Sequence, residues 1–350
     1  MDISYLGYGI GAAIISFFLT PLVRNFAVAH TIIDHPNARK IHTKPIARLG
    51  GVAVIVSFCA IIAFVLITQP QSLRFSDVVL FGIDANLVGV LLGIVILCIV
   101  GVIDDVKGMS PWIKLAGHFG AALLVVVFGV KIWWLHNPIT GIDITLGGWT
   151  YIIVPLWIVL IINVVNWLDG VDGLATGVGV IASVILFFLA RDPEVNQPAT
   201  ALLAIILAGA LVGFLPYNFN PATIFLGDVG SMFIGFILAI FAIISGGKFA
   251  TAALVLGFPI LDALWVVIRR IIRGQPIWHA DRRHLHHRLL DAGLSQRSVV
   301  MGLWALSALF GSIALYSRTH TKFISWLVLV ALMGIVGLLL VVREVKQKNV

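Results

Sequence analysis

The segment NVVNWLDGVDGLATG, residues 163–177, decides how this chain is organised. It is a polar stretch between two apolar runs, WTYIIVPLWIVLII before it and VGVIASVILFFLA after it. Ionisable side chains at membrane depth are expensive, so carboxylates and asparagines in such a position indicate a functional site. Other polar segments that reach the same membrane face are candidates for the same site.

The composition excludes an ordinary soluble domain. Hydrophobic residues make up 60% of the chain, charged residues only 11%, and the mean hydropathy is +1.07. A helix needs about 20 apolar residues to cross a bilayer. Such windows fall at 4–23, 49–68, 86–103, 113–130, 149–166, 174–190, 198–215, 230–246, 250–268, 298–316 and 323–342. The sequence predicts an all-α, polytopic membrane protein with eleven transmembrane helices in a single domain, residues 1–350.

The positive charges predict an orientation. Most of the 23 lysines and arginines fall in the odd-numbered connections and the C-terminal tail. Positive loops stay in the cytoplasm, so we expect the N-terminus outside and the C-terminus inside. A signal peptide begins with positive residues, whereas this sequence has Asp2 near its start, so we do not expect a signal peptide. The basic residues are spread over several loops, which argues against nucleic acid as a partner.

Two smaller features concern structure rather than chemistry. Cys59 and Cys98 lie in apolar windows, and we expect free thiols there. In segment 142–146, apolar residues alternate with Asp143 and Thr145 between glycines, which predicts a short β-hairpin or a re-entrant cap on the outside.

Five polar loops share the predicted cytoplasmic face: 24–48, 104–114, 163–177, 216–231 and 271–297. The first mixes basic residues and histidines, which fits either an ordinary positive-inside loop or a cationic wall for a phosphate-bearing ligand. In the second, Asp104 and Asp105 are adjacent and repel each other unless a cation or a proton lies between them. In a purely structural role, the pair would form an ion pair with Lys107 or Lys114. In a functional role, it would bind a divalent metal or transfer a proton.

The third and fourth loops add three more carboxylates. Asp169 and Asp172 are three residues apart, which places them on one face if the turn is helical. Asn166 offers an uncharged oxygen suited to Mg²⁺ or to a diphosphate. Asp228 follows the aromatic Phe225 in a segment without basic residues, and we expect it to bind a metal, although it is also placed to cap the next helix.

The fifth loop contains three closely spaced histidines, His284, His286 and His287, interleaved with Arg282 and other arginines. His284 and His287, three residues apart, could bind zinc, but no Cys or third well-spaced ligand accompanies that pair, so the set indicates an anion cradle rather than a zinc site.

Asp262 lies seven residues before Arg269 on a predicted helix, two turns apart on one face. For Asp262 we expect a structural pairing with Arg269 or with a partner helix rather than direct chemistry.

Five loop carboxylates on one face favour divalent-metal-assisted transfer involving a diphosphate. The motifs DDVKG, NVVNWLDGVDGLATG, FNPATIFLGDVGS and HADRRHLHHRLLDAGLS, in this order, closely resemble those of the polyprenyl-phosphate N-acetylhexosamine-1-phosphate transferases. The resemblance implies a multi-pass enzyme of the bacterial inner membrane that uses Mg²⁺, or alternatively Mn²⁺. It implies transfer of a sugar-1-phosphate from a UDP-sugar to a polyprenyl phosphate in the lipid bilayer, with release of UMP.

The resemblance also implies roles for individual residues. Asp228 and Asn166 match the metal site, and Asp104 of the acidic pair matches the acceptor of a proton from the lipid phosphate. The expected catalytic residues are Asp104, Asp105 and Asp169. The expected substrate-binding residues, to which Asn220 and Arg282 are added from the same loops, are Lys114, Asn166, Asp172, Asn220, Phe225, Arg282, His284, His286 and His287.

The sequence also suggests which UDP-sugar is the donor and how the transfer proceeds. The HLHH segment resembles the branch that uses UDP-GlcNAc and starts lipopolysaccharide O-antigen, enterobacterial common antigen or teichoic acid on undecaprenyl phosphate. Other UDP-N-acetylhexosamines come next. A single in-line displacement is expected, with a two-step path through an aspartyl-phosphate as the alternative. The oligomeric state, a homodimer included, is left open.

Three rival classes fit less well. A UbiA-type prenyltransferase should show the pattern N-D-x-x-D-x-x-x-D, and a CDP-alcohol phosphotransferase should show D-G-x-x-A-R. Here Asp172 and Gly173 are followed by LATG instead. A transporter should place its carboxylates near the bilayer midplane, often in inverted repeats, whereas these gather at one edge.

Overall fold

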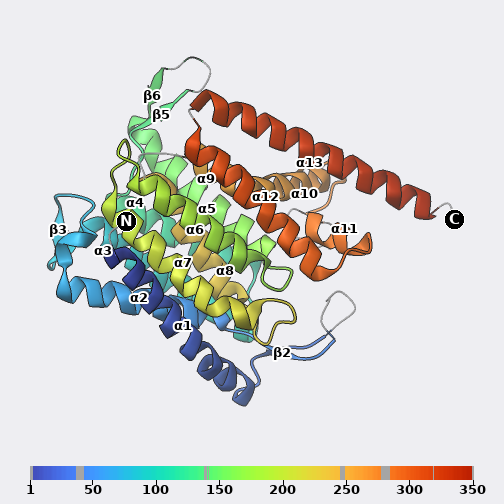
Figure 1. Cartoon of the computed structure of the whole chain (residues 1–350), viewed down its shortest axis with the longest axis horizontal. Helices are drawn as coiled ribbons and strands as arrows, with labels where there is room; N and C mark the ends of the chain where they lie inside the picture. The colour runs from blue at the N-terminus through green and yellow to red at the C-terminus, as the bar shows by residue number, and fades with distance from the viewer. Residues whose placement is uncertain are drawn as a thin grey trace.

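The computed structural model describes residues 3–36, 43–137, 140, 142–244, 249–276, 284–317 and 319–348. Helices dominate these ranges (Figure 1). They are α1 (Ile3–Ala29), α2 (Gly50–Thr68), α3 (Ala85–Lys107), α4 (Pro111–Val127), α5 (Thr150–Leu168), α6 (Leu174–Arg191), α7 (Pro198–Asn218), α8 (Gly227–Ile244), α9 (Phe249–Val255), α10 (Gly257–Ile272), α11 (Leu285–Asp291), α12 (Gln296–Tyr316) and α13 (Thr319–Lys348). Two short 3₁₀ turns, Pro70–Leu73 and Gly147–Trp149, accompany them.

The predicted all-α, polytopic membrane architecture is confirmed. Within the described ranges, nine helices are long and apolar enough to cross a membrane: α1, α2, α3, α5, α6, α7, α8, α12 and α13. The expected window at 113–130 is the 17-residue helix α4. The window at 250–268 is divided between α9 and α10, so it does not form one continuous helix of spanning length.

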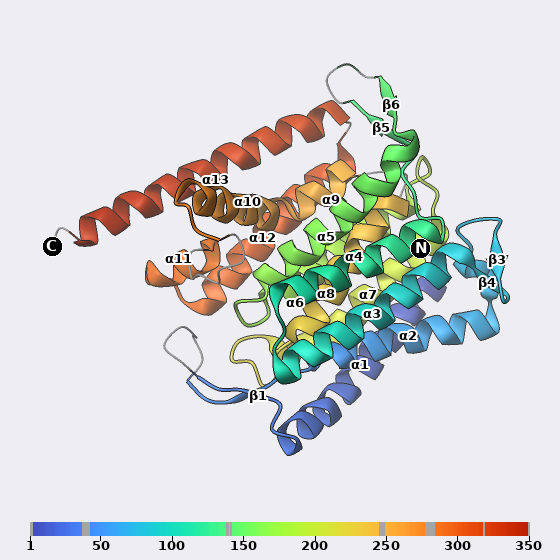
Figure 2. The same cartoon turned by 180° about the vertical axis from the view of Figure 1, so that it is seen from behind.

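Helix α8 forms the centre of the bundle. It packs against α2, α3 and α5, and 83% of the residues in its apolar window are buried. Gly51 and Gly230 allow α2 to approach α8, since a Cβ on Gly51 would lie 2.2 Å from the Cα of Gly230. Helix α13 lies at the periphery beyond α10 and α12, as Figures 1 and 2 show from opposite sides.

The connections between the long helices gather at two ends of the bundle (Figures 1 and 2). At one end, here called the hairpin end, lie two antiparallel hairpins, β3–β4 (Val79–Leu80 and Ile83–Asp84) and β5–β6 (Trp134–His136 and Asp143–Thr145) (Figure 2). The second hairpin is the one predicted from segment 142–146. Its register pairs Leu135 with Ile144.

The opposite end, here called the site end, brings the first and fourth polar loops together. Strands β1 (Ile33–Asp34) and β2 (Ile46–Ala47) pair antiparallel within the first loop. The amide of Phe225 donates to the carbonyl of Ala47 at 2.8 Å, and the amide of Gly50 donates to the carbonyl of Phe225 at 2.9 Å. These backbone bonds hold the first loop against the segment that precedes α8.

Candidate active site

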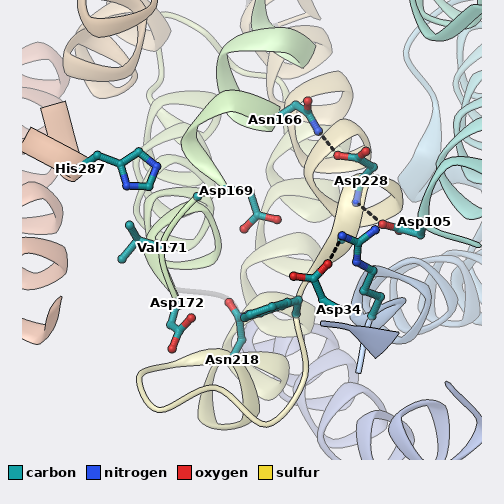
Figure 3. Close-up of a pocket in the computed structure, with 13 residues that line it drawn as sticks. Asp34, Asp105, Asn166, Asp169, Val171, Asp172, Asn218, Asp228 and His287 are labelled. Atoms are coloured by element: carbon teal, nitrogen blue, oxygen red, sulfur yellow. Dashed lines mark hydrogen bonds and ion pairs between the residues drawn. The ribbon is translucent and has the colours of Figure 1, made fainter. Parts of the chain in front are cut away.

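A pocket of about 310 Å³ opens at the site end (Figure 3). Its walls come from α3, α5, α7, α8 and α11, and from the first loop, the α5–α6 turn and the α7–α8 loop. Five carboxylates line it, those of Asp34, Asp105, Asp169, Asp172 and Asp228. Arg48, Asn166, Phe225 and His287 are also among its lining residues. Such a concentration of acid needs cations or hydrogen-bond donors to offset it.

Lys114 connects two of the predicted carboxylates. Its Nζ atom lies 2.7 Å from Oδ2 of Asp104 and 2.8 Å from Oδ2 of Asp228. Lys114 belongs to the first turn of α4, which begins at Pro111, so the short connection from α3 sets its position. Of the two lysines proposed as partners of the acidic pair, Lys114 is the one with these ion pairs. They reach one member of that pair, Asp104, together with Asp228.

Asp105 has a different role from its neighbour. It accepts hydrogen bonds from the backbone amides of Asp228 at 3.0 Å and Val229 at 3.2 Å. These amides begin α8, where backbone donors lack partners within the helix. Asp105 thus caps α8, a function that the sequence offered to Asp228. The carboxylate of Asp228 faces Lys114 and Asn166 instead.

Asn166, near the end of α5, fixes the second oxygen of Asp228. Its Nδ2 atom donates to Oδ1 of Asp228 at 2.5 Å and to Oγ of Ser231 at 2.9 Å. The structure therefore brings Asp104, Lys114, Asn166 and Asp228, which come from four helices, into one hydrogen-bonded group. Their assigned roles in metal and substrate binding stay predictions.

Asp169 and Asp172 both line the pocket although the turn that carries them is not helical. Helix α5 ends at Leu168 and α6 begins at Leu174. Asp172 accepts from the amide group of Asn220 at 3.0 Å and from the backbone amide of Ala222 at 3.1 Å, which holds the loop before α8.

Asp169 projects into the pocket (Figure 3). Within the described part of the chain, hydrogen bonds reach Asp172 and Asp228 but none is donated to the carboxylate of Asp169. Burial raises the pKa of Asp169 well above its usual value, and the negative charges of Asp228, Asp105 and Asp172 raise it further. Asp169 is thus the least compensated acid of the pocket.

The three histidines are divided between the pocket and the protein interior. His287 lines the pocket, whereas His284 and His286 are buried behind it. Burial lowers the pKa of His286 well below its usual value, with smaller contributions from His287 and His284. Of the three, His287 is the one that lines this pocket, and the role of all three in an anion cradle stays a prediction. Arg282 lies outside the described residues.

Asp262 has the structural role expected of it, and its partner is another helix, the second of the two suggested partners. It accepts from Nδ1 of His284 at 2.8 Å and from the backbone amide of Leu285 at 2.7 Å. These bonds tie α10 to the start of α11, in place of the suggested pairing with Arg269.

Asp34 and Arg48 line the pocket but were not among the predicted site residues. They form an ion pair across the first loop, where β1 and β2 meet. The available signal was the basic character of segment 24–48, which suggested a wall for a phosphate-bearing ligand. Arg48 meets that description, and residues 37–42 of the same segment lie outside the described ranges.

The donor set fits a metal that binds together with its substrate. Among the described residues, no group of three or more His, Cys, Asp or Glu side chains is arranged to hold an ion. Mg²⁺ commonly uses one or two carboxylates together with substrate phosphates and water. Asp228, with neighbouring pocket oxygens, meets this requirement.

The fold and the pocket define a multi-pass membrane protein with an acidic ligand site at one end of its helices. The family model described as glycosyl transferase family 4 matches residues 87–246, which include Asp104, Asp169 and Asp228. A relative in Bacillus subtilis, a probable undecaprenyl-phosphate N-acetylglucosaminyl 1-phosphate transferase, is 31% identical over 88% of this chain and 83% of its own length. The chain belongs to glycosyl transferase family 4.

Other relatives cover the chain as fully. A decaprenyl-phosphate N-acetylglucosaminephosphotransferase of Mycobacterium tuberculosis is 36% identical over 87% of this chain and 80% of its own length. A phospho-N-acetylmuramoyl-pentapeptide-transferase of Staphylococcus aureus is 28% identical over 89% and 99%, respectively. The family membership confirms the resemblance drawn from the four motifs.

Proposed function

We propose that this protein transfers GlcNAc-1-phosphate from UDP-GlcNAc to undecaprenyl phosphate, releasing UMP. The observation that carries the proposal is the group formed by Asp104, Lys114, Asn166 and Asp228 beside an acidic pocket. Relatives named as polyprenyl-phosphate N-acetylglucosamine phosphotransferases support the same reaction class. The protein would act in the bacterial inner membrane, at the first step of a lipopolysaccharide or teichoic acid pathway.

The reaction is a displacement at phosphorus. An oxygen of the lipid phosphate forms a bond to the sugar-linked phosphorus, and the bond from that phosphorus to the oxygen of UMP breaks. Asp104 takes up the proton of the lipid phosphate, and Lys114 offsets negative charge beside it. The two-step alternative places an aspartyl-phosphate between two such displacements. A phospho-enzyme trapped with UDP-GlcNAc alone would establish that alternative.

Mg²⁺ is part of the proposal. Asp228 would hold the ion, with Asn166 orienting that carboxylate at 2.5 Å. When bound, the ion supplies charge neutralisation for the diphosphate. The chain's own residues do the rest: Asp172 holds the loop bearing Phe225 against the pocket, and Arg48 and His287 supply nitrogen atoms on its walls.

The test is a defined transfer reaction. The protein is purified in detergent and mixed with Mg²⁺, undecaprenyl phosphate and one of several UDP-sugars, and UMP is measured. UDP-GlcNAc should give metal-dependent UMP that EDTA abolishes, without any ion gradient. The absence of UMP with every UDP-sugar would refute the proposal. Gradient-driven uptake would favour a transporter instead, and a prenylated aromatic product would favour a UbiA-type enzyme.

A further inference from the structure

Asp262 belongs to α10 but holds the start of α11. Its Oδ2 atom lies 2.8 Å from Nδ1 of His284, and its Oδ1 accepts from the amide of Leu285 at 2.7 Å. Asp262 and His284 are 7% and 8% exposed, so water does not replace these bonds readily. A buried carboxylate with both oxygens engaged fixes its partners strongly, because breaking either bond leaves a buried polar group unsatisfied.

A row of rings connects this pair to the pocket. The imidazole of His284 is stacked on that of His286, with centroids 5.6 Å apart and planes 3° from parallel. The rings of His286 and His287 follow at 4.4 Å, and His287 lines the pocket. The position of His287 therefore depends on the hydrogen bonds by which Asp262 holds the start of α11.

The same rings touch the turn that carries Asp169. A Cβ built on Gly170 would lie 2.8 Å from Nε2 of His286 and 3.3 Å from Nε2 of His287. Only a residue without a side chain fits so close to the rings. The histidines thus form a wall against which the Asp169–Gly170 turn lies, and a shift of α11 would displace that turn.

We propose that Asp262 is a positioning residue for the binding of the water-soluble donor. It acts through His284 and His286 on His287 and the Asp169–Gly170 turn. This inference rests on the proposed function, because it assigns one wall of the same pocket to the nucleotide sugar.

The location of that wall indicates the donor rather than the lipid. Helix α11 and residues 169–173 lie outside the helices of spanning length, whereas Asp104, the proposed acceptor of the lipid phosphate's proton, belongs to α3, which is one of them. A nucleotide sugar arrives from water and reaches the parts of the pocket that lie beyond the bilayer. A polyprenyl phosphate arrives from within the bilayer and reaches its phosphate site along the spanning helices.

The experiment compares the KM values of the two substrates. Asp262→Asn keeps the shape and one acceptor oxygen but loses the second acceptor, so α11 should shift. We expect the KM for UDP-GlcNAc to rise about tenfold, with the KM for undecaprenyl phosphate unchanged, as for a lost contact to one substrate. Asp262→Glu, which restores both oxygens, should recover part of the loss.

A matched control separates positioning from general stability. Asp84 at the hairpin end is also a buried carboxylate, 3% exposed, that accepts several backbone amides. Asp84→Asn should lower the thermal midpoint without changing either KM. Equal KM changes for both substrates in Asp262→Asn, or unchanged KM values, would overturn the positioning role.

Hydrogen exchange gives a second readout that does not depend on turnover. Asp262→Asn should speed amide exchange in residues 285–291 and also in residues 169–173, while Asp84→Asn should affect neither segment. Faster exchange confined to 285–291 would show that α11 does not position the turn. Failure of the proposed function is distinct, because it would appear as wild-type protein that releases no UMP with any donor.

Discussion

The two ends of the helix bundle use buried aspartates in opposite ways. At the hairpin end, Asp84 accepts hydrogen bonds from five donors that belong to Phe75, Ser76, Asn86 and Leu87. At the site end, Asp169 projects into a pocket with four other carboxylates, and none of the described residues donates a hydrogen bond to its side chain. One carboxylate is fully compensated by the protein, and the other is not.

The difference distinguishes a carboxylate that stabilises the fold from one that lies in the candidate active site. The donors around Asp84 stabilise its charge and fix the start of α3. The acids around Asp169 repel one another, which disfavours their charged forms unless a cation or a proton offsets them. Proteins retain such unfavourable groups where activity requires them. The contrast makes separate predictions for stability and for activity at the two ends.

The largest expected effect is on activity at the site end. Asp228→Ala removes the partner of both Lys114 and Asn166 and the proposed metal ligand. UMP release should fall by about 100- to 1,000-fold, as for other groups that organise transition-state charge. Membrane insertion should be unchanged, because the apolar helices determine it. Full activity in this variant would refute the metal assignment.

The next effect concerns the cation between two carboxylates. Lys114→Met leaves Asp104 and Asp228 facing each other without the ammonium group. We expect UMP release to fall by about 10- to 100-fold, because the two acids then repel each other and the diphosphate. Lys131→Met is the control, since Lys131 bonds Tyr151 at the hairpin end. Equal losses in both variants would remove the distinction between the ends.

A smaller effect on stability is expected at the hairpin end. Asp84→Ala removes the acceptor for the first amides of α3. Loss of a helix cap costs about 1–2 kcal/mol, so the thermal midpoint should fall by a few degrees. The rate of UMP release per folded molecule should match the wild type. A drop in that rate would show that the hairpin end also contributes to catalysis.

The smallest effect is a gain in stability that depends on pH. The pKa of Asp169 is raised by burial and by neighbouring carboxylates, so the folded protein binds its proton more tightly than the unfolded chain does. Its contribution to stability is complete below the ordinary carboxyl pKa and disappears as pH rises through the raised value. Asp169→Asn should therefore raise the thermal midpoint at pH 8, measured in EDTA.

The gain in Asp169→Asn should shrink as the pH is lowered, because the wild-type carboxyl is then protonated. A gain of the same size at pH 8 and at pH 5 would mean that charge repulsion is not its cause. Asp172→Asn is a useful comparison, since Asp172 has two donors and replacing it should not stabilise the protein in the same way.

The sequence predicted the membrane fold because long apolar runs leave few alternatives in a bilayer. It also indicated the site, because five polar residues lie at the predicted cytoplasmic ends of apolar runs. They are Asp104, Asn166, Asp169, Asp172 and Asp228. The resemblance favoured Asp104 as the proton acceptor, but the sequence did not indicate the different partners of Asp104 and Asp105, which come from other helices. One reaches Lys114 and the other reaches the amides of α8.

The remaining features depend on contacts between distant segments. The bond from His284 to Asp262 joins residues 22 apart, and no local spacing indicates it. The place of Arg48 depends on the pairing of Ala47 with Phe225. Helix α9 ends at Val255 and α10 begins at Gly257, a division that a hydropathy average over 250–268 does not reveal.

The central claim is that the acidic pocket binds the diphosphate of UDP-GlcNAc together with a metal ion. Calorimetric titration of UDP-GlcNAc in the presence of Mg²⁺ or EDTA tests this claim most directly. The account predicts binding to the wild type and to Asp84→Ala with Mg²⁺, and none with EDTA or in Asp228→Ala. Binding of equal strength in EDTA, or in Asp228→Ala, would contradict it.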